Sequence, residues 1–285
     1  MINNKISKNY IAIVLFLLVS ITLLFTACSE NTCNIDSPKQ LYMIDEKVGW
    51  ALSTENEIFY TEQGTNHFQC VHKVSETTSS AETFVNACFL NETTAYLAFF
   101  SGQNIVIENT KDSGRTWSQN YLSYQEYGDA NCVYICFLDE KNGYLLYCGN
   151  PGVGQMTKIL FQTTDGCQKF SVKADLSADI TGYPSGIAFS TLSHGFISTT
   201  YHGTDSYLFS TLDHGATWQN VKLEPCKKIT DVSYIEADPP VFHGEDRKKG
   251  TLILKYVGTE QTNLVEYLTQ DGGLNWTITK ISKSE

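Results

Sequence analysis

The sequence predicts an all-β protein, a β-propeller of about five four-stranded antiparallel blades that fills residues 40–285. Three observations predict this fold. A fragment with a central aspartate recurs about every 50 residues, a second fragment recurs with the same period, and short apolar runs alternate with turn residues. No segment after residue 40 shows a sustained helical period.

The first recurring fragment places an aspartate in a polar turn before an aromatic residue. It reads TKDSGRTW at Thr110–Trp117, TTDGCQKF at Thr163–Phe170, TLDHGATW at Thr211–Trp218 and TQDGGLNW at Thr269–Trp276. Its aspartates are 53, 48 and 58 residues apart, and a weaker copy lies around Glu62. We expect each copy to connect the third and fourth strands of one unit.

The residues of this fragment explain a turn without any catalytic role. An aspartate in a turn accepts bonds from backbone N–H groups, a glycine supplies a positive φ, and the aromatic ring returns to the core. We therefore expect a structural role for Asp112, Gly114, Trp117, Asp165, Phe170, Asp213, Gly215, Trp218, Asp271, Gly273 and Trp276.

The second fragment is a polar turn followed by a small residue and an aromatic one. It occurs at Gly49-Trp50, Ala95-Tyr96, Gly143-Tyr144 and Gly195-Phe196, and we expect it between the first and second strands. The fifth unit departs from it. There the sequence predicts an enlarged turn, Glu236–Gly250 (EADPPVFHGEDRKKG), on the same face as the aspartate turns.

The aspartate fragment resembles the Asp-box, or BNR, repeat of bacterial sialidases, the sortilin ectodomain and the photosystem II assembly propellers. The resemblance covers nearly all of residues 40–285 and implies aspartates at the blade periphery, away from the ligand face. It also implies that a sialidase would need three arginines to grip the sugar carboxylate. The chain has two, Arg115 and Arg247, so sialidase activity is disfavoured.

The N-terminus predicts export and a membrane anchor. Lys5 and Lys8 precede an apolar run, Ile11–Phe25, that ends in the letters FTAC. This resembles a bacterial lipoprotein signal, which implies that residues 1–27 are removed and that Cys28 is lipidated. Residues 28–39 would form a flexible tether, with the protein on the outer face of the bacterial cell membrane. An uncleaved anchor helix is the alternative.

Composition and cysteine spacing narrow the classes of function. The net charge of −11 excludes the basic surface that nucleic-acid binding needs. The cysteines after Cys28 form no CxxC pair, and the sequence predicts no metal site and no cofactor. Counting along the hairpin places Cys132 near Cys148, where a cross-strand disulfide and two buried free thiols both remain open.

Function is expected on the face opposite the aspartate turns, where the loops between second and third strands and the blade connections lie. Tyrosines among short polar residues suit the binding of a sugar or a peptide. The candidates are Tyr201, His202, Asp205, Tyr124, Tyr127, Asp129 and Tyr183. The same residues also fit solvated loops.

The sequence thus predicts a membrane-tethered, extracytoplasmic binding or assembly module that is not an enzyme. Its partner would be a glycan or a protein, not nucleic acid. A glycoside hydrolase or lyase is the alternative, because the acidic residues of the chain neither reveal nor exclude a pair of facing carboxylates.

Overall fold

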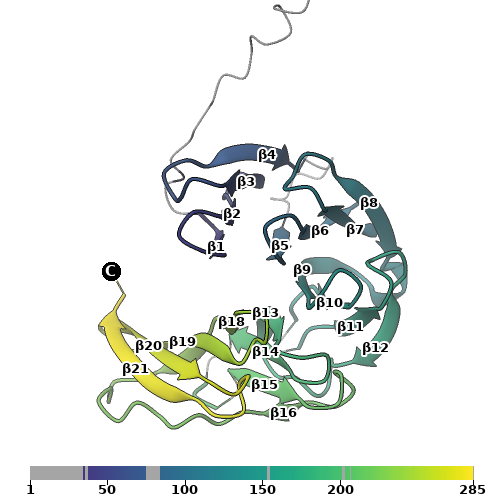
Figure 1. The fold of residues 1–285 in the computed structure, drawn as a ribbon. Coiled ribbons are helices and arrows are strands. Elements are labelled where there is room, and N and C mark those ends of the chain that lie inside the picture. Colours follow the sequence, from purple (N-terminus) through teal and green to yellow (C-terminus); the bar gives the residue numbers. More distant parts are fainter. Residues whose placement is uncertain are drawn as a thin grey trace, which may run out of the picture.

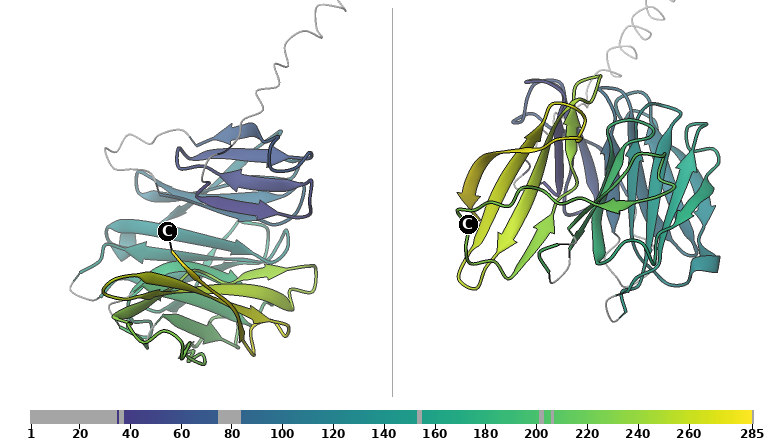
Figure 2. Two further views of the ribbon diagram at one scale, coloured as in Figure 1. Left: turned by 90° about the vertical axis from the view of Figure 1, so that its left-hand side faces the viewer. Right: turned by 90° about the horizontal axis from the view of Figure 1, so that it is seen from below.

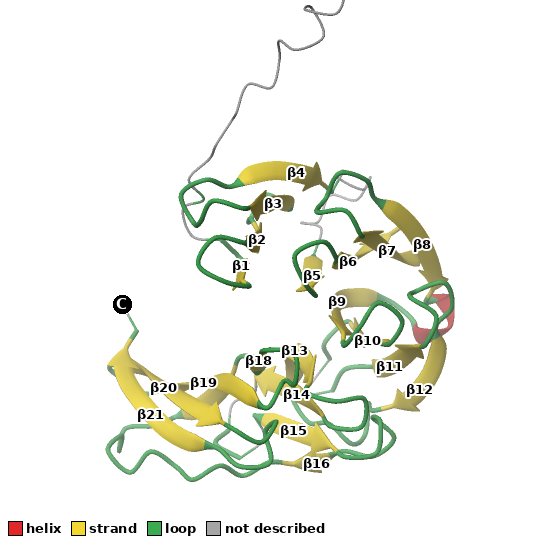
Figure 3. Cartoon of the chain, viewed as in Figure 1, coloured by secondary structure: helices red, strands yellow, loops and turns green. Residues whose placement is uncertain are grey.

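The computed structural model describes residues 35, 38–74, 84–152, 155–200, 203–205 and 207–284. Over these residues the chain is built from β-strands and one short 3-10 helix, η1 (Gln125–Tyr127), with no α-helix (Figure 3). Within the same ranges, no helix has the length and apolarity needed to cross a bilayer. The predicted signal peptide, Cys28 and most of the predicted tether lie outside the described residues.

Three four-stranded antiparallel sheets come first along the chain, and in each the strands pair in chain order. The first sheet is β1 (Gln40–Met43), β2 (Gly49–Leu52), β3 (Glu57–Thr61) and β4 (Gln69–Lys73). The second is β5 (Val85–Phe89), β6 (Ala95–Ser101), β7 (Asn104–Thr110) and β8 (Ser118–Ser123). The third is β9 (Ala130–Phe137), β10 (Gly143–Gly149), β11 (Lys158–Thr163) and β12 (Ser171–Asp175).

The remaining strands form one nine-stranded sheet. It consists of two groups of strands, which we call the fourth group and the last group because they follow the three separate sheets. The fourth group is β13 (Tyr183–Phe189), β14 (Gly195–Thr200), β15 (Leu208–Thr211) and β16 (Gln219–Asn220). The last group is β17 (Tyr234–Ala237), β18 (Val241–His243), β19 (Lys249–Val257), β20 (Thr262–Thr269) and β21 (Thr277–Lys283). One residue pair between β14 and β17, Thr200 with Glu236, links the two groups into a single sheet.

The sheets follow one another around a centre, with their first strands innermost (Figure 1). Figure 2 shows them stacked face to face when the molecule is turned on its side. The arrangement is an open arc, because the first sheet and the last group do not meet in these views. Among the described residues, buried apolar clusters join each sheet to the next, but none joins the last group to the first sheet.

The second recurring fragment places its small residues as predicted, since Gly49, Ala95, Gly143 and Gly195 each begin a second strand. The side chain at the end of the preceding inner strand explains why these residues are small. Gly143 lies opposite Phe137, and a Cβ on Gly143 would come within 2.8 Å of the phenyl ring. The glycine therefore leaves room for an aromatic side chain at the end of the first strand.

The aromatic residue of the same fragment joins neighbouring sheets. Tyr96 stacks on Phe137 with ring centroids 3.6 Å apart, and Tyr144 stacks on Phe189 at 3.8 Å. Equivalent pairs are Trp50 with Phe89 at 5.7 Å and Phe196 with Phe242 at 5.8 Å. Each pair contributes about 0.5–1.5 kcal/mol beyond the burial of its apolar area.

At the two ends of the arc the corresponding positions carry no aromatic ring. Thr251 follows Gly250 in β19, where the other units have Trp, Tyr or Phe, and Met43 ends β1, where the others have Phe. The aromatic contacts therefore connect successive sheets but leave the ends of the arc without a matching pair.

The predicted enlarged turn of the fifth unit is wrong. Residues 234–243 form the inner strand of the last group, in two pieces, because β17 and β18 both pair with β19. Pro239 and Pro240 lie between the pieces, and proline has no N–H to donate to a sheet. The turn itself is short and runs from Gly244 to Lys248.

Candidate functional site

Two sets of turns lie on one face of the arc, as predicted. In each sheet the turn between third and fourth strands bonds to the turn between first and second strands. Ser113 N–H donates to Thr93 O at 2.9 Å, Gly166 N–H to Lys141 O at 3.0 Å and Gly272 N–H to Lys248 O at 2.8 Å. We call this the turn face.

The aspartate turns share one hydrogen-bond pattern. In the second sheet, Thr110 Oγ1 donates to Asp112 Oδ1 at 2.9 Å, and Thr116 donates its N–H to Oδ1 at 2.8 Å and its hydroxyl to Oδ2 at 2.6 Å. The turns at Asp213 and Asp271 repeat this arrangement. At Asp165 the residue four positions on is Lys169, which donates only its N–H, at 3.0 Å.

These bonds keep the aspartates ionised. Hydrogen bonds from the side chain and N–H of Thr217 lower the pKa of Asp213 to about 2, and those from Asn275 lower the pKa of Asp271 to about 2. The pKa of Asp112 is likewise lowered, first by the Thr116 hydroxyl. Carboxylates held in this way fix a turn and are poor proton donors.

In the turns at Asp112, Asp213 and Asp271 the glycine packs on the preceding sheet. Gly114 has a φ of 84°, and a Cβ there would come within 2.6 Å of Val71 in β4. The Trp117 ring stacks on His72 with centroids 4.6 Å apart. Gly114 and Trp117 thus join the first and second sheets.

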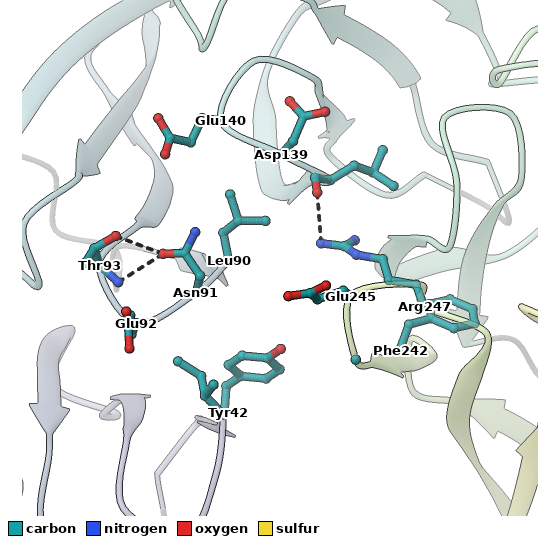
Figure 4. Close-up of a pocket in the computed structure, with 13 residues that line it drawn as sticks. Tyr42, Leu90, Asn91, Glu92, Thr93, Asp139, Glu140, Phe242, Glu245 and Arg247 are labelled. Atoms are coloured by element: carbon teal, nitrogen blue, oxygen red, sulfur yellow. Dashed lines mark hydrogen bonds between the residues drawn. The ribbon is translucent and has the colours of Figure 1, made fainter.

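A cavity of about 730 Å³ opens on the turn face, around the centre of the arc (Figure 4). Its walls come from the first, second and third sheets and the last group. They comprise Tyr42, Ile44, Leu90, Asn91, Glu92, Thr93, Leu138, Asp139, Glu140, Phe242, Gly244, Glu245 and Arg247. The volume lies within the range of small-ligand sites.

Several polar groups of the cavity are already engaged. Asn91 Oδ1 accepts bonds from Thr93 and Thr94 in its own turn, and Glu140 pairs with Lys111 at 3.0 Å. Burial alone would raise the pKa of Asp139, but hydrogen bonds from Asn142 and Lys141 outweigh it and hold that pKa below its usual value.

Arg247 crosses the centre of the arc. Its guanidinium donates to the carbonyl oxygens of Phe189 at 3.2 Å, Phe137 at 3.1 Å and Leu138 at 3.4 Å. The last group is thereby tied to the third sheet and the fourth group. All three bonds go to backbone carbonyl oxygens, so this arginine connects elements of the fold.

Three side chains of the cavity remain available to a ligand. Within the described ranges, the Tyr42 hydroxyl and the carboxylates of Glu92 and Glu245 have no hydrogen-bond or ion-pair partner. Glu92 accepts one hydrogen bond, from the Ser113 hydroxyl at 2.9 Å, but with its backbone carbonyl. In Figure 4, Glu92 and Glu245 lie on different sides of the space into which Tyr42 projects.

The predicted binding residues lie in several places. Tyr201 and His202 are outside the described residues. Tyr124 and Tyr127 come together, because both rings contact Tyr147, at 5.4 and 5.9 Å.

The other predicted residues do not join this aromatic cluster. The Asp129 carbonyl accepts the Tyr147 hydroxyl at 3.0 Å, while its own side chain is exposed. Tyr183 packs against a different cluster, the buried apolar one between the third sheet and the fourth group. Asp205 borders a separate pocket of about 440 Å³ beside Tyr207 and Cys226.

The comparisons with known proteins bear on the fold. No protein-family model matches the chain, and no curated protein matches it. Among solved structures, the six-bladed Aleuria aurantia lectin aligns over 84% of this chain and 73% of its own, with 8% identity and a TM-score of 0.52. The chain is a β-propeller.

Two further solved structures resemble this propeller. SapL1 lectin in complex with alpha methyl fucoside aligns over 88% of this chain and 83% of its own, with 11% identity and a TM-score of 0.51. YCF48 bound to D1 peptide aligns over 87% and 82%, with 11% identity and a TM-score of 0.48. At these identities the likeness concerns the fold alone.

No ligand role was predicted from the sequence for the residues of this cavity. Four of them, Asn91, Glu92, Asp139 and Glu140, stand in the polar turns of the second recurring fragment, which could have indicated them. Among the described residues, no three His, Cys, Asp or Glu side chains gather as a metal ion would require.

Proposed function

We propose that this protein is a non-catalytic binding module that holds a glycan or a protein segment in the cavity of the turn face. The proposal includes a five-bladed Asp-box propeller, with β13–β16 and β17–β21 as its fourth and fifth blades. It also includes a lipid anchor at Cys28 that keeps the module on the outer face of the bacterial cell membrane.

The open cavity at the centre of the arc carries this proposal. It combines the rings of Tyr42 and Phe242 with a free hydroxyl and the carboxylates of Glu92 and Glu245. Aromatic faces bind the apolar face of a sugar or a side chain, and nearby polar groups fix its orientation. The structure of SapL1 lectin, a protein of the same fold, holds a fucoside.

The charge of the cavity selects the class of ligand. Four acidic residues line it against one arginine, so the carboxylates outnumber the cation. An anionic glycan would therefore meet net repulsion. We therefore expect a neutral or positively charged ligand.

Binding is best tested on a glycan array and a set of cationic peptides, followed by titration calorimetry. If its ring is an anchor, Tyr42→Ala should weaken binding by about 1–3 kcal/mol. Tyr121→Ala is the matched control, because Tyr121 is 64% exposed on β8, away from the cavity. Thermal melts establish that both variants fold.

Other outcomes separate the alternatives. Loss of binding in Tyr201→Ala but not in Tyr42→Ala would place the ligand on the opposite face. Turnover of a bound glycan that stops in Glu245→Gln would show a hydrolase instead, since hydrolysis needs a pair of carboxylates on either side of the bond.

A further inference from the structure

Three adjacent strands of the third sheet place two thiols and an amine in one row. Cys148 in β10 lies directly opposite Cys132 in β9 on one side and Lys158 in β11 on the other. Residues that face each other across antiparallel strands project from the same side of the sheet. Both cysteines belong to the buried cluster between the third sheet and the fourth group.

The distance between the cysteines suits a covalent bond. Directly opposed residues of an antiparallel pair have Cα atoms about 4.5–5.5 Å apart, and a disulfide requires about 4.4–6.8 Å. Both residues are free thiols in this structure. The prediction that hairpin counting brings Cys132 close to Cys148 is confirmed by the register.

The amine of Lys158 is unusual in its burial. The residue is 1% exposed, and its Nζ donates to the carbonyl oxygen of Met156 at 3.1 Å. Burial lowers the pKa of this amine, while the negative charges of a Cys148 thiolate and of Asp175 oppose that change. A buried lysine costs folding free energy unless a partner stabilises its charge, and a thiolate is such a partner.

We infer that Cys132 and Cys148 are a redox-active dithiol that closes to a disulfide. The Cys132 thiolate attacks one sulfur of a low-molecular-weight disulfide, which forms a mixed disulfide and releases one thiolate. The Cys148 sulfur then attacks the Cys132 sulfur, and the departing second thiolate takes up the proton that Cys148 loses. One disulfide of the oxidant is reduced to two thiols as the protein dithiol is oxidised.

The order of attack follows from the environments of the two sulfurs. Cys132 is 6% exposed and Cys148 is 0% exposed, so the oxidant reaches Cys132 first. A hydrogen bond from the Cys148 thiol lowers the pKa of Cys132, which favours its thiolate. Burial raises the pKa of Cys148, so this sulfur stays protonated while Cys132 reacts with the oxidant.

The test treats the folded full-length chain with oxidised glutathione, then alkylates, digests and maps the cysteines by mass. We expect a Cys132–Cys148 cross-link in the wild type and in the Cys136→Ser control, whose cysteine lies in the same strand opposite Tyr144. Cys148→Ser should stop at the glutathione adduct of Cys132. Exposed Cys70 should take up glutathione in every sample and so shows that the oxidant is active.

Lys158→Met is a second control. This variant removes the amine that faces Cys148 in the register and keeps an unbranched buried side chain, so we expect the same cross-link to form. Glutathione on Cys70 without a Cys132–Cys148 cross-link, or a cross-link to Cys136 instead, would overturn the dithiol itself.

Discussion

Replacement of Arg247 should destabilise the whole arc, because this side chain joins elements that are far apart in the sequence. Its guanidinium donates to carbonyl oxygens of Phe137, Leu138 and Phe189 at 3.1–3.4 Å. Its backbone has a φ of 48°, a left-handed conformation that disfavours any residue with a side chain. The three hydrogen bonds therefore hold the arginine in a strained backbone.

The size of the effect follows from these bonds. A hydrogen bond from a charged donor contributes about 1.5–3 kcal/mol, and three bonds to one group share that gain and do not add. We expect Arg247→Met to lower the free energy of unfolding by about 3 kcal/mol. Arg247→Gly should lower it by about 2 kcal/mol, because glycine relieves about 1 kcal/mol of backbone strain.

Urea unfolding followed by tryptophan fluorescence measures these differences, with thermal melts as a second method. A loss of about 3 kcal/mol corresponds to a fall in Tm of about 6–12 °C for a chain of this size. Arg115→Met is the control, because Arg115 is exposed in an aspartate turn. If Arg247→Met and Arg115→Met unfold at the same urea concentration, the three hydrogen bonds do not stabilise the fold as argued.

Four further predictions concern other parts of the chain. Asp213→Ala should lower stability by about 1 kcal/mol, through loss of exposed turn bonds, with ligand binding unchanged; a stable variant that cannot bind would contradict the structural role. Hydrogen bonds hold the pKa of Asp213 and Asp271 to about 2, below the ordinary 3.8. The stability that these carboxylates contribute is therefore complete above about pH 4 and should fade as the pH falls towards 2. Acid titration followed by circular dichroism measures this loss. Cys28→Ser should release the protein from membranes in a fractionation assay, and retention at unchanged mass would indicate an uncleaved helix. If the face opposite the turn face binds the partner, Tyr201→Ala should weaken the binding free energy by about 1–3 kcal/mol, measured by calorimetry.

The strands and their order could be predicted because their signals are local. A small residue begins β2, β6, β10 and β14 in the structure as in the prediction, since the opposing side chain lies only a few residues back in the same hairpin. The register of Cys132 and Cys148 could be predicted for the same reason. The propeller fold is confirmed, and the number of blades remains a prediction.

The cavity and the broken strand could not be predicted from the same signals. The dipeptide Pro239-Pro240 is typical of a turn, but here it interrupts a strand whose two pieces are aligned by β19. The cavity depends on how turns from separate sheets converge, which no local pattern encodes. Arg247 illustrates this, because its acceptors lie 58 to 110 residues away in the chain.

The open arc gives ligand binding a thermodynamic consequence. The cavity is lined at one end of the arc by Tyr42 and at the other by Phe242 and Glu245, so a ligand held by these residues touches both ends. Where Thr251 and Met43 provide no aromatic pair, the ligand itself would connect the last group to the first sheet. Such a ligand binds the folded chain and not the unfolded one, so each tenfold rise in its concentration above Kd should raise the free energy of unfolding by about 1.4 kcal/mol.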